Sequence, residues 1–261
     1  MSRAAAAALL VSAAATAALI LILVSRGPAV EPDRLPPPLP PAPAPAFQIP
    51  TPRPLDEPIP AARWAPVLQS VPARLEPSTG SPVAALLESQ TPEGTANIVL
   101  VRQRAVDDTG MLWIKVTIPG LPGETDGWVP RPALGTYHAV RTRLLIDLDR
   151  LSATLLRDGQ AVFRSKIGVG TAVSPTPRGS YYVRSRLTKY ANPFYGPLAF
   201  GTSVRSPSVT DWPDGGFVGL HGTNQPELLP GRVSHGCIRF RNGDILRLGR
   251  LMPIGTPISI Q

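Results

Sequence analysis

The sequence predicts a mainly β protein with one short helix near its C-terminus. Short runs rich in Val, Ile, Leu and aromatic residues recur from residue 98 to the end, and clusters of Gly, Pro, Asn and Asp separate them. Helical patterns are too few for an alternating α/β fold, and the chain has no internal repeat, phosphate-binding loop or GxGxxG element. We therefore expect β domains in which helices play a minor part.

The first 26 residues form a candidate membrane segment. After Arg3, 21 small or apolar residues run without a charge from position 4 to position 24, and Arg26 follows. A run of this length can cross a bilayer as a helix. A cleavable signal peptide is the alternative, but its apolar region is usually shorter, and no small-x-small cleavage site ends this run. Either reading predicts a chain outside the cytoplasm, anchored in the cell envelope or secreted after cleavage.

Residues 27–66 are predicted to be a proline-rich linker. Between positions 28 and 60, 14 of 33 residues are proline, and proline cannot donate a backbone hydrogen bond. An extended polyproline chain rises about 3.1 Å per residue, so it could hold a domain on the order of 100 Å from a membrane. A tail with no tethering role would have the same composition.

Residues 67–138 are predicted to form a small β domain. Three β-rich runs cover residues 98–103, 112–118 and 127–130, and a short helix is predicted at residues 82–89. The order of a WIKV strand, a PGLPGETD loop and a GWVP strand resembles bacterial SH3-like barrels. A plain β subdomain packed on its neighbour is the alternative.

Residues 139–261 are predicted to form a second, larger β domain. Asp158-Gly159 is a strong signal for a type I′ hairpin turn. Asn242 or Asp244 can cap a short helix that runs to Met252. The predicted strands cover residues 143–149, 153–157, 160–164, 179–185, 217–220 and 257–260.

Positive charge is concentrated in this second domain. Residues 1–140 hold 10 Lys and Arg against 11 Asp and Glu, whereas residues 141–261 hold 16 against 7, in a chain of net charge +8. The imbalance predicts an anionic partner, and for an exported chain without an aromatic-interleaved basic motif an acidic extracellular polymer fits better than nucleic acid. A solubilising surface is the alternative. With one cysteine the chain cannot form an internal disulfide.

The segment 221–239 holds that cysteine and two of the three histidines. Cys237 is a candidate nucleophile, and His221 is a candidate base that would generate the thiolate. Gly236 permits a tight turn in which the amides of His235, Gly236 and Cys237 could stabilise an oxyanion. Arg239 could hold a substrate carboxylate, with a surface salt bridge as its alternative.

Three other readings of this segment are possible. A lone cysteine is often a buried structural residue. Zinc ligation by Cys237, His221 and His235 lacks a second cysteine or an acidic residue at ligand spacing. Papain-like and NlpC/P60-type peptidases place the cysteine before the histidine, whereas here the order is reversed. We therefore expect catalysis that needs no metal and no other cofactor.

The segment HGTNQPELLPGRVSHGCIRFRNGD, with PTPRGSYYV before it and GTPISI after it, resembles the catalytic domain of the L,D-transpeptidases, the YkuD family. The resemblance covers about residues 141–261. It rests on a histidine followed, after about 14 to 17 residues, by the sequence Ser or Thr, His, Gly, Cys. The matching positions are His221, Ser234, His235, Gly236 and Cys237, together with Arg239 and Asn242.

The resemblance implies a β-sandwich fold and a two-step acyl transfer in peptidoglycan biosynthesis and cell-shape maintenance. Cys237 would attack a tetrapeptide stem at its third residue and release the terminal D-alanine, with His221 as acid and base. An amine of another stem would resolve the thioester to a 3→3 cross-link or a protein-to-wall link, and carbapenem β-lactams would inhibit. Ser234 and His235 would support the site, while Gly222 and Thr223 would shape the substrate cleft.

Two rival functions remain open at this point. An L,D-carboxypeptidase would resolve the same thioester with water. A non-catalytic wall-binding module would keep the fold without using the thiol.

Overall fold

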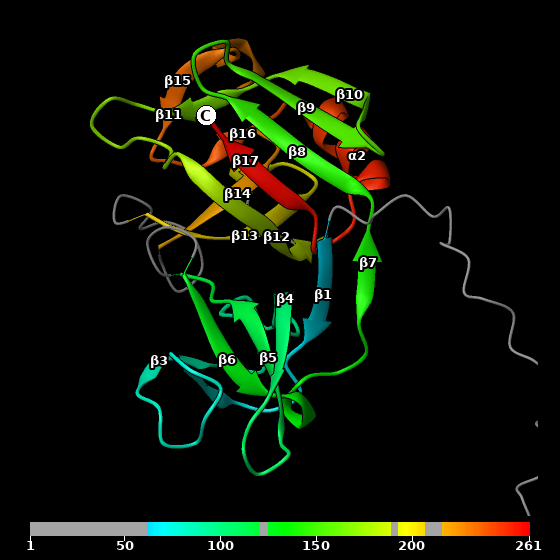
Figure 1. Ribbon diagram of the computed structural model, residues 1–261. Coiled ribbons are helices and arrows are strands. Elements are labelled where there is room, and N and C mark those ends of the chain that lie inside the picture. The colour runs from blue at the N-terminus through cyan, green and yellow to red at the C-terminus, as the bar shows by residue number, and fades with distance from the viewer. Residues whose placement is uncertain (1–61, 121–124, 189–192, 207–215) are drawn as a thin grey trace, which may run out of the picture. The chain divides into compact units, whose positions relative to one another are not determined.

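The computed structural model describes residues 62–120, 125–188, 193–206 and 216–261, which all belong to one compact unit (Figure 1). The predicted membrane segment and most of the predicted linker lie outside the described residues. Within the described ranges, no helix is both long enough and apolar enough to cross a membrane.

The N-terminal part of the described chain is a seven-stranded sheet with the order β3-β2-β6-β5-β4-β1-β7. Its paired strands run antiparallel to each other. A 3-10 helix, η1, covers Arg131–Ala133 between β6 and β7. The strands are β1 (Ala62–Pro66), β2 (Val71–Arg74), β3 (Val83–Leu87), β4 (Ile98–Val106), β5 (Leu112–Thr117), β6 (Asp126–Pro130) and β7 (His138–Val140).

Two features of this sheet differ from the sequence prediction. The helix predicted at residues 82–89 is wrong, because Val83–Leu87 forms strand β3 and pairs with β2. Helix propensity is a weak preference, and pairing with a neighbouring strand overrides it here. Strand β1 begins inside the predicted linker, where Trp64 pairs with Leu100 of β4. The three predicted strands, by contrast, are confirmed as β4, β5 and β6.

The C-terminal part is a ten-stranded sheet with the order β10-β9-β8-β17-β12-β13-β14-β16-β11-β15. Two 3-10 helices, η2 (Pro193–Tyr195) and η3 (Pro226–Leu228), and one helix, α2 (Asn242–Leu251), accompany it. The strands are β8 (Thr142–Asp147), β9 (Ser152–Arg157), β10 (Gln160–Lys166), β11 (Gly168–Gly170), β12 (Gly179–Leu187), β13 (Ala199–Arg205), β14 (Phe217–His221), β15 (Gly231–Ser234), β16 (Ile238–Arg239) and β17 (Pro257–Ile260).

The local predictions for this region are largely confirmed. Asp158 and Gly159 have φ values of 52° and 81°, the left-handed conformation that a type I′ turn requires, and they join β9 to β10. The helix is present, but its N-cap is Arg241, and neither Asn242 nor Asp244 provides the cap. Asn242 lies inside the helix, where its side chain has a different partner, described below. The mainly β class with one short C-terminal helix is confirmed.

Each sheet has its own apolar core, and one tyrosine links the two. Ile114 and Val116 are buried in the first core, and Phe200 and Phe240 in the second. Tyr182 of β12 is fully buried beside Ile98, and its hydroxyl donates to the Ile98 carbonyl at 3.0 Å. Strand β14, which ends at the candidate base His221, lies next to β16, which begins one residue after the candidate nucleophile Cys237 (Figure 1).

Candidate active site

The fold brings Cys237 and His221 together through parallel pairing of β14 with β16. Leu220 pairs with Ile238, and the amide of Gly219 donates to the Cys237 Sγ at 3.3 Å. Cys237 thus lies beside Gly219, which is two positions before His221 on β14. Strand spacing and rise place the two Cα atoms about 8 Å apart, a separation that their side chains can bridge.

The imidazole of His221 is buried and held in one orientation. Its Nδ1 lies 2.6 Å from the carbonyl oxygen of Gly222. Because a carbonyl can only accept, Nδ1 carries the proton and Nε2 is the basic nitrogen. The ring of Tyr195 packs edge-on against it, with 4.8 Å between centroids and 69° between planes. A buried histidine with a fixed tautomer is suited to receive a proton at Nε2.

The loop before Cys237 is shaped by Ser234 and Gly236. The Ser234 hydroxyl donates to the carbonyl of Cys237 at 2.6 Å and accepts from the amide of Gly236 at 3.2 Å. Gly236 has a φ of 120°, a conformation that residues with a side chain rarely adopt. The Ser234 hydroxyl thus engages the Gly236 amide, which is one of the three amides predicted to stabilise an oxyanion. The His235 side chain is exposed.

A second hydroxyl, that of Thr176, also bonds to this loop. Thr176 is buried, and its hydroxyl donates to the Gly236 carbonyl at 2.8 Å while it accepts from the Gly170 amide at 2.9 Å. A Cβ on Gly170 would lie 2.2 Å from the Ser174 carbonyl oxygen, so the chain must pass close here. No role was predicted for Thr176, although it lies within the PTPRGSYYV segment that resembles the family.

The segment after the base is fixed by the side chain of Asn242. Its Oδ1 accepts from the amide of Thr223 at 2.9 Å and would lie 2.3 Å from a Cβ on Gly222. The Thr223 hydroxyl in turn accepts from the Gln225 amide at 3.0 Å. Gly222 and Thr223 are therefore buried residues that set the path of the chain next to His221.

Arg239 is buried, with 7% of its surface exposed, and its Cζ lies 4.5 Å from the centroid of the Phe194 ring. This burial rules out the alternative of a surface salt bridge. Phe194 and Tyr195 belong to η2, which the sequence analysis did not single out. Two adjacent aromatic residues after a proline carried no signal of a site, because such residues more often pack a core.

Cys237 itself is 6% exposed and lies at the edge of the second core. Burial of this degree would also fit a structural cysteine. The neighbouring histidine, the glycine with positive φ and the two hydroxyls beneath the loop distinguish this position from ordinary packing. Within the part of the chain that the structure describes, no three His, Cys, Asp or Glu residues are grouped as metal ligands would be.

A thiol and an imidazole near the ends of adjacent strands, beside a loop in which Gly236 has a positive φ, define a candidate cysteine acyl-transfer site on a β domain. Comparison with known proteins gives the family. Residues 141–260 match the model of YkuD, the L,D-transpeptidase catalytic domain. The L,D-transpeptidase YkuD of Bacillus licheniformis is 30% identical over 129 residues, which cover 49% of this chain and 71% of that protein. The chain belongs to the YkuD family of L,D-transpeptidases.

Other relatives are more distant or match in part. YkuD of Bacillus subtilis strain 168 is 29% identical over 145 residues, covering 56% of this chain and 73% of that protein. The solved catalytic domain of the E. faecium L,D-transpeptidase is 25% identical, with 46% of this chain and 96% of that chain covered and a TM-score of 0.36. An avibactam carbamoyl enzyme, Ldtfm, is also 25% identical, with 46% of this chain covered and a TM-score of 0.37, and this chain spans 49% of its length.

Proposed function

We propose that this protein is a peptidoglycan L,D-transpeptidase that works through a cysteine acyl-enzyme. The observation that carries the proposal is the pairing of β14 with β16, which places the sulfur of Cys237 against the Gly219 amide, two residues from a histidine of fixed tautomer. Membership of the family supports the same chemistry.

In the first step His221 Nε2 takes the thiol proton, and Sγ of Cys237 attacks the carbonyl carbon of the third stem residue. The amides of His235 and Cys237 stabilise the tetrahedral oxyanion. When it collapses, the bond to the terminal D-alanine breaks and the proton on Nε2 moves to the leaving amine. The product is a thioester on Cys237.

In the second step the side-chain amine of another stem attacks the thioester carbonyl. His221 takes a proton from the attacking amine, the carbon–sulfur bond breaks, and the proton returns to the thiolate. The new amide is a 3→3 cross-link, or a protein-to-wall link when the acceptor amine belongs to a protein. Water in place of the amine would make the enzyme an L,D-carboxypeptidase.

The supporting residues hold the reacting groups and the substrate in position. Ser234 and Thr176 hold the carbonyls of Cys237 and Gly236, so the loop amides keep their direction. Arg239 holds a stem carboxylate through its fork of donors. Gly222 fixes the His221 tautomer, and Thr223 maintains the wall of the cleft.

The remaining architecture is proposed from the sequence. Residues 1–26 anchor the chain in a membrane, the proline-rich linker spans toward the wall, and residues 67–138 form an SH3-like domain outside the cytoplasm. Fractionation of cells that express the full chain tests this placement. Recovery with membranes, together with digestion by protease added outside, is expected; recovery in the cytosol would contradict it.

The activity is tested with the purified full chain, a tetrapeptide donor and an amine acceptor. The expected product has the mass of the two peptides joined after loss of alanine, and Cys237→Ala forms none. Release of alanine with only the hydrolysed tripeptide would identify a carboxypeptidase. No loss of alanine with the unaltered chain would contradict both enzymes and favour a wall-binding module.

A further inference from the structure

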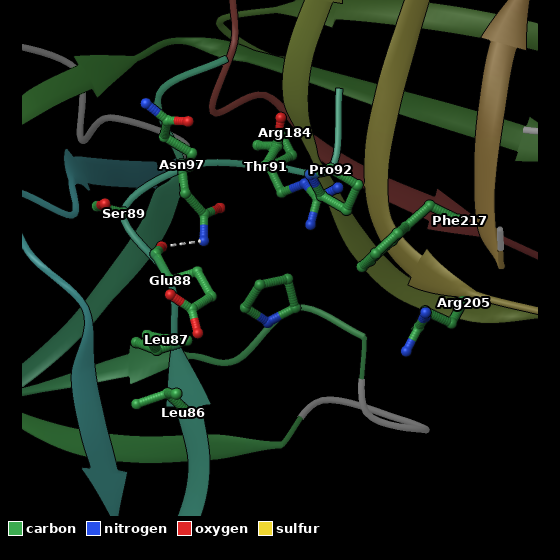
Figure 2. Close-up of a pocket in the computed structure, with 12 residues that line it drawn as sticks. Leu86, Leu87, Glu88, Ser89, Thr91, Pro92, Asn97, Arg184, Arg205 and Phe217 are labelled. Atoms are coloured by element: carbon green, nitrogen blue, oxygen red, sulfur yellow. Dashed lines mark hydrogen bonds between the residues drawn. The ribbon is translucent and has the colours of Figure 1, made fainter. Parts of the chain in front are cut away.

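A cavity of about 650 Å³ lies where the β3–β4 connection meets strands β12 to β14 (Figure 2). Its volume is in the range of small-ligand sites. Residues 86–92 and Asn97 line one side, and Arg184, Arg205 and Phe217 line the other. Neither Cys237 nor His221 is among its lining residues, so it is separate from the site described above.

Two guanidinium groups and an aromatic ring form the catalytic-domain wall of the cavity. The Cζ atoms of Arg184 and Arg205 lie 3.8 Å and 5.0 Å from the centroid of the Phe217 ring. Arg184 is paired with Glu93 at 3.3 Å, and both side chains are almost completely buried. Burial lowers the pKa of Arg184, while Glu93 raises it and Arg205 lowers it further. Two guanidinium groups therefore lie against the same ring, with the Glu93 carboxylate beside that of Arg184.

The cavity also has an acidic end. Glu88 is on the wall opposite the arginines in Figure 2, and its carboxylate accepts from the Ser70 hydroxyl. A ligand that fits must therefore place its negative group at the end where Arg205 and Phe217 lie. A like charge beside Glu88 would be repelled.

Two polar atoms on the cavity walls are buried without a hydrogen-bond partner among the described residues. They are the Oδ1 of Asn97 and the Nε of Arg184. The Nδ2 of Asn97 is engaged, because it donates to the Glu88 carbonyl at 2.7 Å. Native proteins seldom leave buried polar atoms unpaired without a bound water, ion or ligand.

The cavity and the candidate active site share strand β14. Phe217 is two residues from Gly219, whose amide contacts the Cys237 sulfur, so the two positions are about 6.6 Å apart along the strand. Gly201 of β13 pairs with Gly219, and a Cβ on Gly201 would lie 3.2 Å from the Glu93 carboxylate. The cavity wall therefore reaches the strand pair next to the nucleophile.

We propose that this cavity receives a carboxylate-bearing part of the donor stem peptide, with the carboxylate bound by Arg205 over the Phe217 ring. The inference rests on the proposed function, because it names a second contact for the same substrate. An exposed arginine at the end of a half-apolar cavity suits a peptide carboxylate with an aliphatic neighbour. Thr91 and Pro92 would contact the apolar part.

The test measures binding by titration calorimetry to the full chain carrying Cys237→Ala, which cannot react. Two tetrapeptides serve as probes, identical except that the internal carboxylate is free in one and amidated in the other. Adding Arg205→Ala is expected to weaken binding of the free-carboxylate peptide about tenfold and leave binding of the amidated peptide unchanged. Arg186→Ala, an exposed arginine on β12 outside the cavity lining, is the matched control and should change neither affinity.

Equal affinities of the two peptides, or an equal loss with Arg205→Ala and Arg186→Ala, would overturn the proposal. Failure of both peptides to bind would overturn it as well. Thermal unfolding of Arg205→Ala at the temperature of the unaltered chain is expected and shows that the fold is intact. If the peptides bind through Arg205 but never acylate Cys237 in the unaltered chain, the transpeptidase proposal fails while the cavity assignment stands.

Discussion

Two polar clusters, one in each sheet, lie in opposite settings. In the seven-stranded sheet the cluster surrounds Asp107 at the β4–β5 turn, where the carboxylate accepts from Thr109, Met111 and the Trp113 indole. In the ten-stranded sheet the cluster is buried beneath the cysteine loop and consists of Thr176, Ser234 and the groups that they bond.

This difference separates a stabilising role from a positioning role. Polar groups at an exposed turn close a hairpin, and loss of one of them affects mainly that turn. Buried hydroxyls are costly unless they are fully bonded, so a pair of them under a short loop fixes the loop in one geometry. We expect substitutions in the buried cluster to affect acylation and substitutions at the turn to affect local stability alone.

The largest effect is expected from His221→Ala. Loss of the general base should lower the rate of Cys237 acylation by about 10²- to 10⁴-fold while the fold is retained. The measurement is the rate of carbapenem adduct formation by intact mass, with thermal unfolding as the check on folding. His138→Ala, at a histidine that stacks on Trp64 away from the site, should acylate normally. An unchanged rate in His221→Ala would remove this residue as the base.

The next effect is expected from Thr176→Val, which removes the hydroxyl but keeps the shape. It leaves the Gly236 carbonyl and the Gly170 amide without their partner, at a cost of about 1–3 kcal/mol for each buried group. Both the acylation rate and the free energy of unfolding should fall. Thr176→Ser keeps the hydroxyl and should restore the rate. If Thr176→Val acylates as the unaltered chain does, the loop does not depend on this contact.

A smaller effect is expected at the contact between the sheets. Tyr182→Phe removes the hydrogen bond to the Ile98 carbonyl and should lower the free energy of unfolding by about 1 kcal/mol. Acylation should be unchanged, since the hydroxyl is not near the reacting groups. Chemical denaturation measures the difference, with Tyr137→Phe, an exposed tyrosine, as the neutral control. A loss of acylation without a loss of stability would show that Tyr182 serves the site.

The smallest effect is expected at the Asp107 turn and depends on pH. The side-chain hydrogen bond from Thr109 and then that from Trp113 lower the pKa of Asp107 from 3.8 to about 2. A carboxylate whose pKa is lower in the folded state stabilises the fold above the unfolded pKa, and that contribution is lost as the pH falls from about 4 to about 2. The Trp113 indole resonance should shift in this window. Asp107→Asn should abolish the shift, whereas Asp108→Asn should not; a shift that persists in Asp107→Asn would assign it to another group.

Local sequence signals were sufficient for most strands, whereas the candidate site was predicted from the motif that joins His221 to Cys237. Alternating apolar residues and the Asp158-Gly159 turn predict their hairpin because both signals are contained in a few neighbouring residues. The helix predicted at residues 82–89 is wrong because these residues pair with strand β2, and a pairing with another segment is not visible in the residues themselves.

The supporting residues of the site could not be predicted for the same physical reason. Thr176 meets Gly236 across 60 positions of the sequence, and Asn242 reaches back 19 positions to the Thr223 amide. Asn242 was predicted as a helix cap from its place in the sequence, whereas tertiary contacts give its side chain another partner. Only the folded sheet brings such pairs together.

The most direct test of the central claim is to locate the acyl group. The full chain is incubated with the tetrapeptide donor without an acceptor, digested at low pH and mapped by mass spectrometry. The account predicts the donor mass less alanine on the peptide that contains Cys237, absent in Cys237→Ala and strongly reduced in His221→Ala. An acyl group on any other residue, or alanine release that persists in Cys237→Ala, would contradict it.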